Sequence, residues 1–271
     1  MMLLVDAGNS RIKWSLLHKG KRSKQFAQDY TQESADIILL GLLQARLKQA
    51  KTEKRIRHIV LVSVLADNFM RNVEKHCQAL NISLHIIRSE AEAYGVRNAY
   101  ENATRLGADR FVGLITAHHL MPNQHCIIVS CGTAITIDAM TATGQHLGGL
   151  ILPGLQSFSD SLIKKSALLD TPNTSKVTLF AKNTTDAISS GNIYGLVDAI
   201  NGISSRMKGK LLKINNIGGK TKKMTSVQTI LCGGDAKLIH QYLSASTQRE
   251  DDWLMQGLQF IAESTFPRLQ K

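Results

Sequence analysis

A short pattern that occurs twice, almost half the chain apart, constrains the fold more than any other feature of this sequence. Residues Val5–Ile12 align with Val129–Thr136 at an offset of 124 positions in a chain of 271 residues. Each copy reads as an apolar strand, a small-residue turn that contains a glycine, and a second strand. One such hairpin is common, but two in equivalent places indicate two domains of one design. We therefore expect an N-terminal domain over residues 1–120 and a C-terminal domain over residues 121–271.

Strands and helices alternate along the rest of the chain, a pattern typical of a layered α/β architecture. Short apolar runs predict strands at residues 57–64, 82–87, 125–130, 134–140, 148–152 and 229–232. Helical spacing of apolar residues predicts helices over 34–49, 67–79, 105–120, 155–167 and 183–206, and two more from about 236 and 253. Residues 91–103 read as a loop, and the basic segment 208–223 reads as an exposed loop or hairpin.

Composition excludes several classes of protein. Hydrophobic residues make up 43% and charged residues 20% of the chain, which is ordinary for a globular protein. No apolar run approaches the roughly 18 residues that span a bilayer, and no secretory leader is recognisable, so we expect a cytoplasmic protein with no membrane partner. The spacing of the cysteines is not typical of a disulfide framework or a zinc site, and we expect all four to be reduced: Cys77, Cys126, Cys131 and Cys232.

The net charge of +12 and the isoelectric point near 9.6 suggest binding to nucleic acid or another anion. The basic runs lie at residues 19–24, 51–57 and 208–223, and they lack the interleaved aromatic residues on which bases stack. No helix-turn-helix or zinc-finger signature accompanies them. We therefore interpret the basic runs as solvated surface and expect no nucleic-acid partner.

Three glycine turns follow predicted strands, at Gly8, at Gly132 and at Gly233–Gly234. Backbone N–H groups of such turns suit phosphate oxygens, Lys13 would add a positive charge, and Asp6 would hold Mg²⁺ through water. On the pattern alone, three ordinary tight turns explain the residues equally well. The Gly-Lys-Thr sequence at 219–221 is no P-loop because isoleucine stands where the earlier glycine is required, and no dinucleotide fingerprint follows a strand.

The sequence Gly107-Ala108-Asp109-Arg110 lies near the start of a predicted helix. A carboxylate beside an arginine at such a place is typical of a general base with an anchoring cation. It is also typical of a helix that simply carries an acid in its first turn, where the helix dipole favours negative charge.

Taken together and in order, these motifs identify a resemblance to the type III pantothenate kinases of the actin-like ATPase superfamily. The resemblance spans nearly the whole chain and rests on Asp6–Ser10 with Lys13, Gly107–Arg110, Gly132–Ala134 with Thr136 and Asp138, Gly148–Gly149 with Pro153–Gly154, Asn183–Thr184, Ser190–Gly191, and Gly233–Asp235. It implies two ribonuclease-H-like α/β domains, each a mixed sheet flanked by helices, with the active site in the interdomain cleft. It also implies a homodimer that phosphorylates pantothenate to 4'-phosphopantothenate, the first step of coenzyme A biosynthesis.

The resemblance assigns roles to individual residues. Asp109 would be the general base, and Asp6 would lie near Mg²⁺ and bind it through water. The residues implied to bind ATP are Asp6, Ala7, Gly8, Asn9, Ser10, Arg11, Ile12, Lys13 and Thr133, with Gly132 in the second phosphate turn. The residues implied to bind pantothenate are Tyr100, Gly107, Ala108, Asp109, Arg110 and Thr184.

One position departs from the family pattern. The family carries an aspartate before the second turn, where it binds a monovalent cation (K⁺ or NH₄⁺), and this chain has Ser130 there. A neutral hydroxyl is a weaker cation ligand, so we expect the monovalent-cation site to be absent or replaced. The departure leaves open a second function, a non-catalytic transcriptional accessory factor of the same fold. The enzyme is favoured because all four key residues of the site are present: Asp6, Asp109, Arg110 and Thr133.

Overall fold

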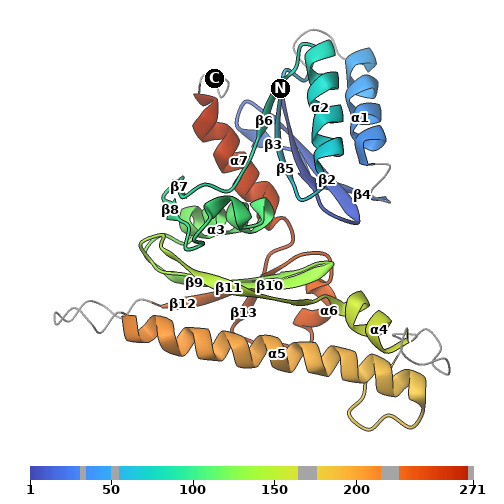
Figure 1. Ribbon diagram of the computed structural model, residues 1–271, viewed down its shortest axis with the longest axis vertical. Helices are drawn as coiled ribbons and strands as arrows, with labels where there is room; N and C mark the ends of the chain where they lie inside the picture. The colour runs from blue at the N-terminus through green and yellow to red at the C-terminus, as the bar shows by residue number, and fades with distance from the viewer. Residues whose placement is uncertain (31–34, 50–54, 164–175, 215–225, 268–271) are drawn as a thin grey trace. The chain divides into compact units, whose positions relative to one another are not determined.

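The computed structural model describes residues 1–30, 35–49, 55–163, 176–214 and 226–267, and they form two compact units (Figure 1). One unit comprises Met1–Leu120 and Asp252–Lys271, and the other comprises Met121–Asp251. We expected residues 252–271 in the C-terminal domain. The last helix, α7 (Trp253–Thr265), belongs to the first unit instead, because its apolar face packs on α3 (Ala108–Leu120) and on the first sheet. None of the described helices is both long and apolar enough to cross a membrane.

The first unit is built around β1 (Met2–Ala7), whose six residues are all buried. An antiparallel partner, β2 (Arg11–His18), lies on one side of β1 and a parallel partner, β5 (His58–Ser63), on the other. The sheet order is β3-β2-β1-β5-β6, and the remaining strands are β3 (Lys21–Arg22), β4 (Phe26–Asp29), which pairs with β2, and β6 (Ser83–Ile86). Its helices are α1 (Ala35–Gln49), α2 (Asp67–Ala79), α3 and α7.

The second unit repeats this plan. Strand β9 (His125–Cys131) lies between an antiparallel β10 (Ala134–Met140) and a parallel β12 (Val227–Cys232). The order β11-β10-β9-β12-β13 matches the first sheet strand for strand, with β11 (His146–Pro153) and β13 (Thr247–Arg249) at the edges. Its helices are α4 (Leu155–Ile163), α5 (Thr184–Ile214) and α6 (Ala236–His240). The predicted fold class, two α/β halves with mixed sheets flanked by helices, is confirmed.

The predicted hairpins at residues 5–12 and 129–136 are both present, as β1–β2 and β9–β10. Two predicted segments differ from expectation. The expected loop 91–103 contains a small hairpin of β7 (Glu92–Ala93) and β8 (Val96–Arg97), followed by a 3-10 turn at Ala103–Arg105. The expected loop from residue 208 is helical as far as Ile214, because Leu211 is buried against the second core. Residues 215–223 lie outside the described part of the chain, as does the end of the helix predicted over 155–167.

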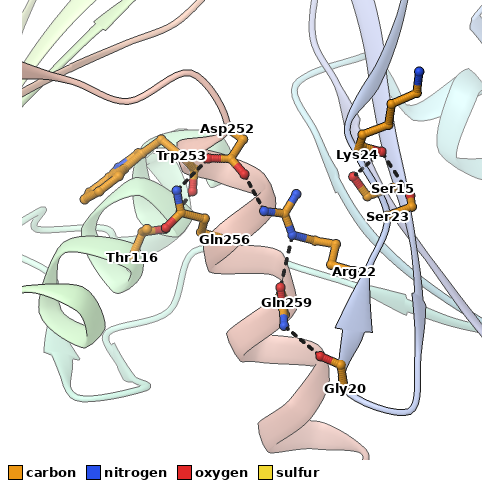
Figure 2. A network of polar contacts seen from close by, with 10 residues as sticks. All are labelled: Ser15, Gly20, Arg22, Ser23, Lys24, Thr116, Asp252, Trp253, Gln256 and Gln259. Carbon is orange, nitrogen blue, oxygen red and sulfur yellow. Dashed lines mark hydrogen bonds and ion pairs between the residues drawn. The ribbon is translucent and has the colours of Figure 1, made fainter.

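Helix α7 is fixed in the first unit by close packing and by a polar network. A Cβ on Gly257 would come within 2.1 Å of the Thr116 hydroxyl, so only glycine permits this approach to α3. The Trp253 side chain is buried, and its indole N–H donates to the Gly113 carbonyl at 3.2 Å. Figure 2 shows the network on the other side of the helix, where Arg22 of β3 pairs with Asp252 and donates to Gln259 at 3.0 Å. A helix from the end of the chain thereby supports α3, which carries the Gly107–Arg110 motif.

Candidate functional site

A buried carboxylate lies at the end of β1. Asp6 is opposite Lys13 in the β1–β2 register, and the Lys13 ammonium lies 3.9 Å from the Asp6 carboxylate. Burial raises the pKa of Asp6 to about 6. Of the nearby charges, Lys13 lowers that pKa and the Asp109 carboxylate raises it. The structure thus brings together two carboxylates that are 103 positions apart, both within the first unit.

The turn after β1 is a compact loop closed by the backbone. The Gly8 N–H donates to the Arg11 carbonyl at 3.1 Å, and a Cβ on Gly8 would lie only 3.3 Å from that oxygen. The Tyr30 hydroxyl donates to the Gly8 carbonyl, and the Tyr30 N–H donates to the Ser10 carbonyl at 3.1 Å. Burial and the Asp6 charge raise the pKa of Tyr30 to about 12, so its hydroxyl remains a donor at neutral pH.

Asp109 is in the first turn of α3, where the helix dipole favours a negative charge. Its carboxylate accepts the Arg110 N–H at 2.8 Å. A Cβ on Gly107 would lie 2.7 Å from the same carboxylate oxygen, so glycine at this position gives the Asp109 side chain its room. The predicted motif is therefore a real local unit, in which Gly107 serves the residue two positions later.

Arg110 is buried, with 8% of its surface exposed. Its guanidinium donates to the Tyr100 hydroxyl at 2.8 Å and lies 5.5 Å from the centre of the Tyr100 ring. Tyr100 is held in turn by Asn98, whose side chain accepts the Tyr100 N–H at 3.0 Å and donates to the carbonyls of Glu90 and Ala103 at 3.3 and 3.1 Å. Tyr100, Asp109 and Arg110, singled out by resemblance, are therefore connected around the start of α3.

In the second unit, three glycine turns meet at one end of the sheet. The Gly154 N–H donates to the Thr133 carbonyl at 3.2 Å, and a Cβ on Gly154 would lie 2.3 Å from the Gly132 carbonyl oxygen. Gly233 has a φ of +103°, and a Cβ there would lie 2.2 Å from the Cys131 carbonyl oxygen. The motifs at 132–134, 153–154 and 233–235, which are far apart in the sequence, thus form one close-packed backbone cluster around the β9–β10 turn.

Ser130 occupies the expected cation position, half-buried on β9 between Thr136 of β10 and Cys232 of β12. The nearby carboxylate of Asp138 pairs with His146 instead, at 3.0 Å, and both side chains are buried. Burial raises the pKa of the Cys131 thiol far above its usual range. The carboxylate nearest Ser130 on β10 is thus already paired with His146, whereas Asp6 and Lys13 pair beside the first turn.

Thr184 is exposed at the beginning of α5. The helix start is capped by Asn183, whose side chain accepts the Asp186 N–H and donates to the Asp186 carboxylate, both at 2.8 Å. Ser130, Gly132, Thr133 and Thr184 belong to the second unit, and the other residues to which the resemblance gives a role belong to the first.

Two residues that the sequence analysis did not single out shape the site. Tyr30 fixes the carbonyls of the first turn, and Asn98 fixes the loop that carries Tyr100. An Asn in a loop just before the Tyr100 position was a usable signal, because asparagine side chains commonly bond backbone groups two residues on. Tyr30 had no such signal, since it reaches Gly8 only through the pairing of β4 with β2.

The described residues fit Mg²⁺ only where substrate phosphates and water supply most of its ligands. Among the described residues, no group of three or more histidine, cysteine or acidic side chains converges as a metal cage. Asp6 does supply a carboxylate beside a phosphate-type turn, and protein-bound Mg²⁺ commonly takes one or two carboxylates, water and substrate phosphates.

Two units with one strand order, each with a glycine turn after its central strand, define a two-domain α/β protein built on a repeated plan. The profile of the type III pantothenate kinase family matches residues 2–206. The type III pantothenate kinase of Herminiimonas arsenicoxydans is 34% identical over 271 residues, which cover 98% of this chain and 99% of that protein. That of Janthinobacterium sp. (strain Marseille) is 34% identical over 265 residues, with 97% of each chain covered. The chain belongs to the type III pantothenate kinase family, and the expected enzyme class is confirmed.

A solved structure supports the fold independently. A Campylobacter jejuni protein described as a Baf family transcriptional activator superposes with a TM-score of 0.57 at 22% identity, covering 98% of this chain and 100% of that one. At this identity the likeness concerns the fold alone.

Proposed function

We propose that this protein transfers the γ-phosphoryl group of ATP to the primary hydroxyl of pantothenate, forming 4'-phosphopantothenate for coenzyme A biosynthesis. The observation that carries the proposal is that Asp109, at the start of α3, lies near enough to Asp6, at the end of β1, for its charge to raise the pKa of Asp6. Family membership supplies the substrate class. Phosphoryl transfer needs positioning and charge neutralisation, and the two carboxylates would position the acceptor and Mg²⁺ while Lys13 and Mg²⁺ would neutralise phosphate charge.

ATP would bind on the turn from Asp6 to Lys13, and the family resemblance also assigns Gly132 and Thr133 to phosphate binding. Backbone N–H groups of glycine turns suit phosphate oxygens, and the Lys13 ammonium adds a positive charge next to Asp6. When bound with ATP, Mg²⁺ neutralises phosphate charge. Asp6 would hold that ion through water, because protein-bound Mg²⁺ keeps several of its water ligands.

Asp109 would accept the proton of the pantothenate hydroxyl. The hydroxyl oxygen then bonds to the γ-phosphorus of ATP as the bond from that phosphorus to ADP breaks. A carboxylate within hydrogen-bond reach of the attacking hydroxyl is a sufficient base for this step. Glycine at 107 leaves room beside one carboxylate oxygen, and the α3 dipole favours its ionised form. Arg110, held by Tyr100, would orient the anionic substrate, to which Gly107, Ala108 and Thr184 would also contribute.

A coupled ADP-release assay with ATP, Mg²⁺ and pantothenate tests the proposal. We expect turnover that requires all three components, and mass spectrometry should detect a product heavier than pantothenate by one phosphoryl group. Wild-type protein that binds ATP yet releases no ADP with pantothenate would overturn the kinase function. That result would favour the non-catalytic alternative.

We further propose that the protein is a cytoplasmic homodimer with no nucleic-acid partner. The family resemblance supports the dimer, and four buried cysteines in reduced form agree with a reducing compartment. Light scattering on the purified protein measures the mass, for which we expect twice the chain mass of 29.8 kDa.

A further inference from the structure

Tyr30 holds the β1–β2 turn by two hydrogen bonds. Tyr30 follows β4, and it contacts the turn twice, through its hydroxyl to the Gly8 carbonyl and through its backbone N–H to the Ser10 carbonyl at 3.1 Å. Its ring packs against the apolar core of the first unit. The hydroxyl is therefore carried on a rigid support and directed at one peptide bond.

The planarity of the Gly8–Asn9 peptide couples the direction of the Gly8 carbonyl to that of the Asn9 N–H. In a trans peptide the C=O and the following N–H point in opposite directions. When the Gly8 carbonyl is held on Tyr30, the Asn9 N–H is held on the side away from Tyr30. A flip of this peptide would exchange the carbonyl and the N–H, and it would place a carbonyl oxygen where the N–H had been. An anion is attracted by N–H groups and repelled by carbonyl oxygens, so the flip would weaken anion binding.

In the second unit a carbonyl of the equivalent turn is also held by donors from outside the turn. The Thr133 carbonyl of the β9–β10 turn accepts the Gly154 N–H at 3.2 Å and lies 3.4 Å from the Ser157 hydroxyl. In both units an outside donor thus holds a carbonyl of the turn. In the first unit that donor is a side chain, which a conservative substitution can remove.

We infer that Tyr30 is a positioning residue for ATP: its hydroxyl holds the Gly8–Asn9 peptide in the orientation that receives phosphate. This inference rests on the proposed function for the identity of the ligand. Tyr30 itself touches no reacting atom and acts through the turn. The inference therefore concerns affinity for the nucleotide and not for the acceptor substrate.

The test compares Tyr30→Phe with Tyr94→Phe. Both substitutions remove one phenolic hydroxyl in the first unit and keep the ring, and the Tyr94 hydroxyl lies 3.4 Å from the Thr265 hydroxyl, away from the turn. Calorimetry measures the binding of a non-hydrolysable ATP analogue with Mg²⁺ to each protein, without pantothenate. We expect about five- to tenfold weaker binding for Tyr30→Phe, the effect of one hydrogen bond, and less than about a twofold change for Tyr94→Phe.

Kinetics on the same proteins supply the second readout. We expect the KM for ATP to rise in Tyr30→Phe while the KM for pantothenate stays within about twofold of wild type. Unchanged nucleotide affinity in Tyr30→Phe, an equal loss in Tyr94→Phe, or an equal rise in both KM values would overturn the inference. The inference and the proposed function can fail separately. If only Tyr30→Phe loses nucleotide affinity, and the wild-type protein does not phosphorylate pantothenate, the inference is supported and only the proposed function is overturned.

Discussion

The two hairpin turns of this protein share a plan and differ in chemistry. Both follow the central strand of a sheet with the same strand order, and both close with a backbone bond, from Gly8 to Arg11 and from Gly132 to Ala134, each at 3.1 Å. At equivalent positions just before the turns stand Asp6 in the first unit and Ser130 in the second. Asp6 and Lys13 pair beside the first turn, and close glycine backbone encloses the second.

The two turns therefore differ in what a substitution should affect. A buried carboxylate is costly unless it is paired, and Asp6 retains that cost because Lys13 offsets it only in part, which the raised pKa records. The second turn has no such cost and instead depends on close approaches that only glycine allows. We therefore expect substitutions at the first turn to change activity most, and substitutions at the second to change stability most.

The largest effect should follow from removing the charge of Asp109. We expect Asp109→Asn to lower kcat by about 10²- to 10⁴-fold, the usual contribution of a general base. Asp67→Asn is the matched control, because Asp67 is an exposed acid in the first turn of α2 in the same unit. If steady-state rates show Asp109→Asn to be as active as Asp67→Asn, then Asp109 is not the base.

Asp6→Asn should separate stability from activity. The native pKa of Asp6, about 6, exceeds the unfolded value of 3.8, so the native protein binds a proton more readily and its stability from this group rises as pH falls through 6. The amide mimics the neutral form, so we expect Asp6→Asn to be more stable than wild type by about 3 kcal/mol above pH 6. That gain should vanish near pH 4, while activity is lost at every pH.

Denaturant unfolding at pH 7.5 and pH 4 measures this difference. A variant that is less stable than wild type at pH 7.5 would show that the Lys13 pair outweighs the cost of burial, contrary to our account.

Two glycine substitutions should have effects of opposite sign on the second unit. Gly233→Ala places a Cβ against the Cys131 carbonyl at a positive φ, and we expect it to lower the free energy of unfolding by about 1–3 kcal/mol. Gly195→Ala, in α5 with open space around the position, should raise it by up to about 1 kcal/mol. Thermal unfolding of both variants provides the comparison, and a stabilised Gly233→Ala would contradict the close packing of this turn.

The smallest effect concerns the monovalent cation. With Ser130 in place of a carboxylate, we expect exchange of K⁺ for Na⁺ to alter the wild-type rate by less than about twofold, because a neutral hydroxyl binds such ions weakly. Ser130→Asp gives the second turn the carboxylate that the first turn has, and we expect K⁺ to activate this variant. Strong activation of the wild type by K⁺ is the result that would refute the assignment.

Much of this fold follows from local sequence. The apolar run before Asp6 predicts a buried strand, the glycine at position 8 predicts the turn, and the helix start at Trp253 matches the observed α7. The sequence-based predictions differ from the structure where contacts between distant segments decide where a helix ends or which unit it joins. Helix α5 continues to Ile214 through a basic stretch because Leu211 has a core to pack against. Helix α7 joins the first unit because Gly257 fits against α3.

The sequence by itself determined the two-hairpin plan and the residue types of the site, because turn chemistry and side-chain periodicity act over a few residues. Only the tertiary structure decided which of these residues meet. The electrostatic interaction of Asp6 with Asp109 and the hydrogen bond from Tyr30 to Gly8 depend on strand register and helix packing, which join segments far apart in the chain. The same long-range packing buries Asp6, and its burial alters the pKa of a carboxylate that is ordinary in the sequence.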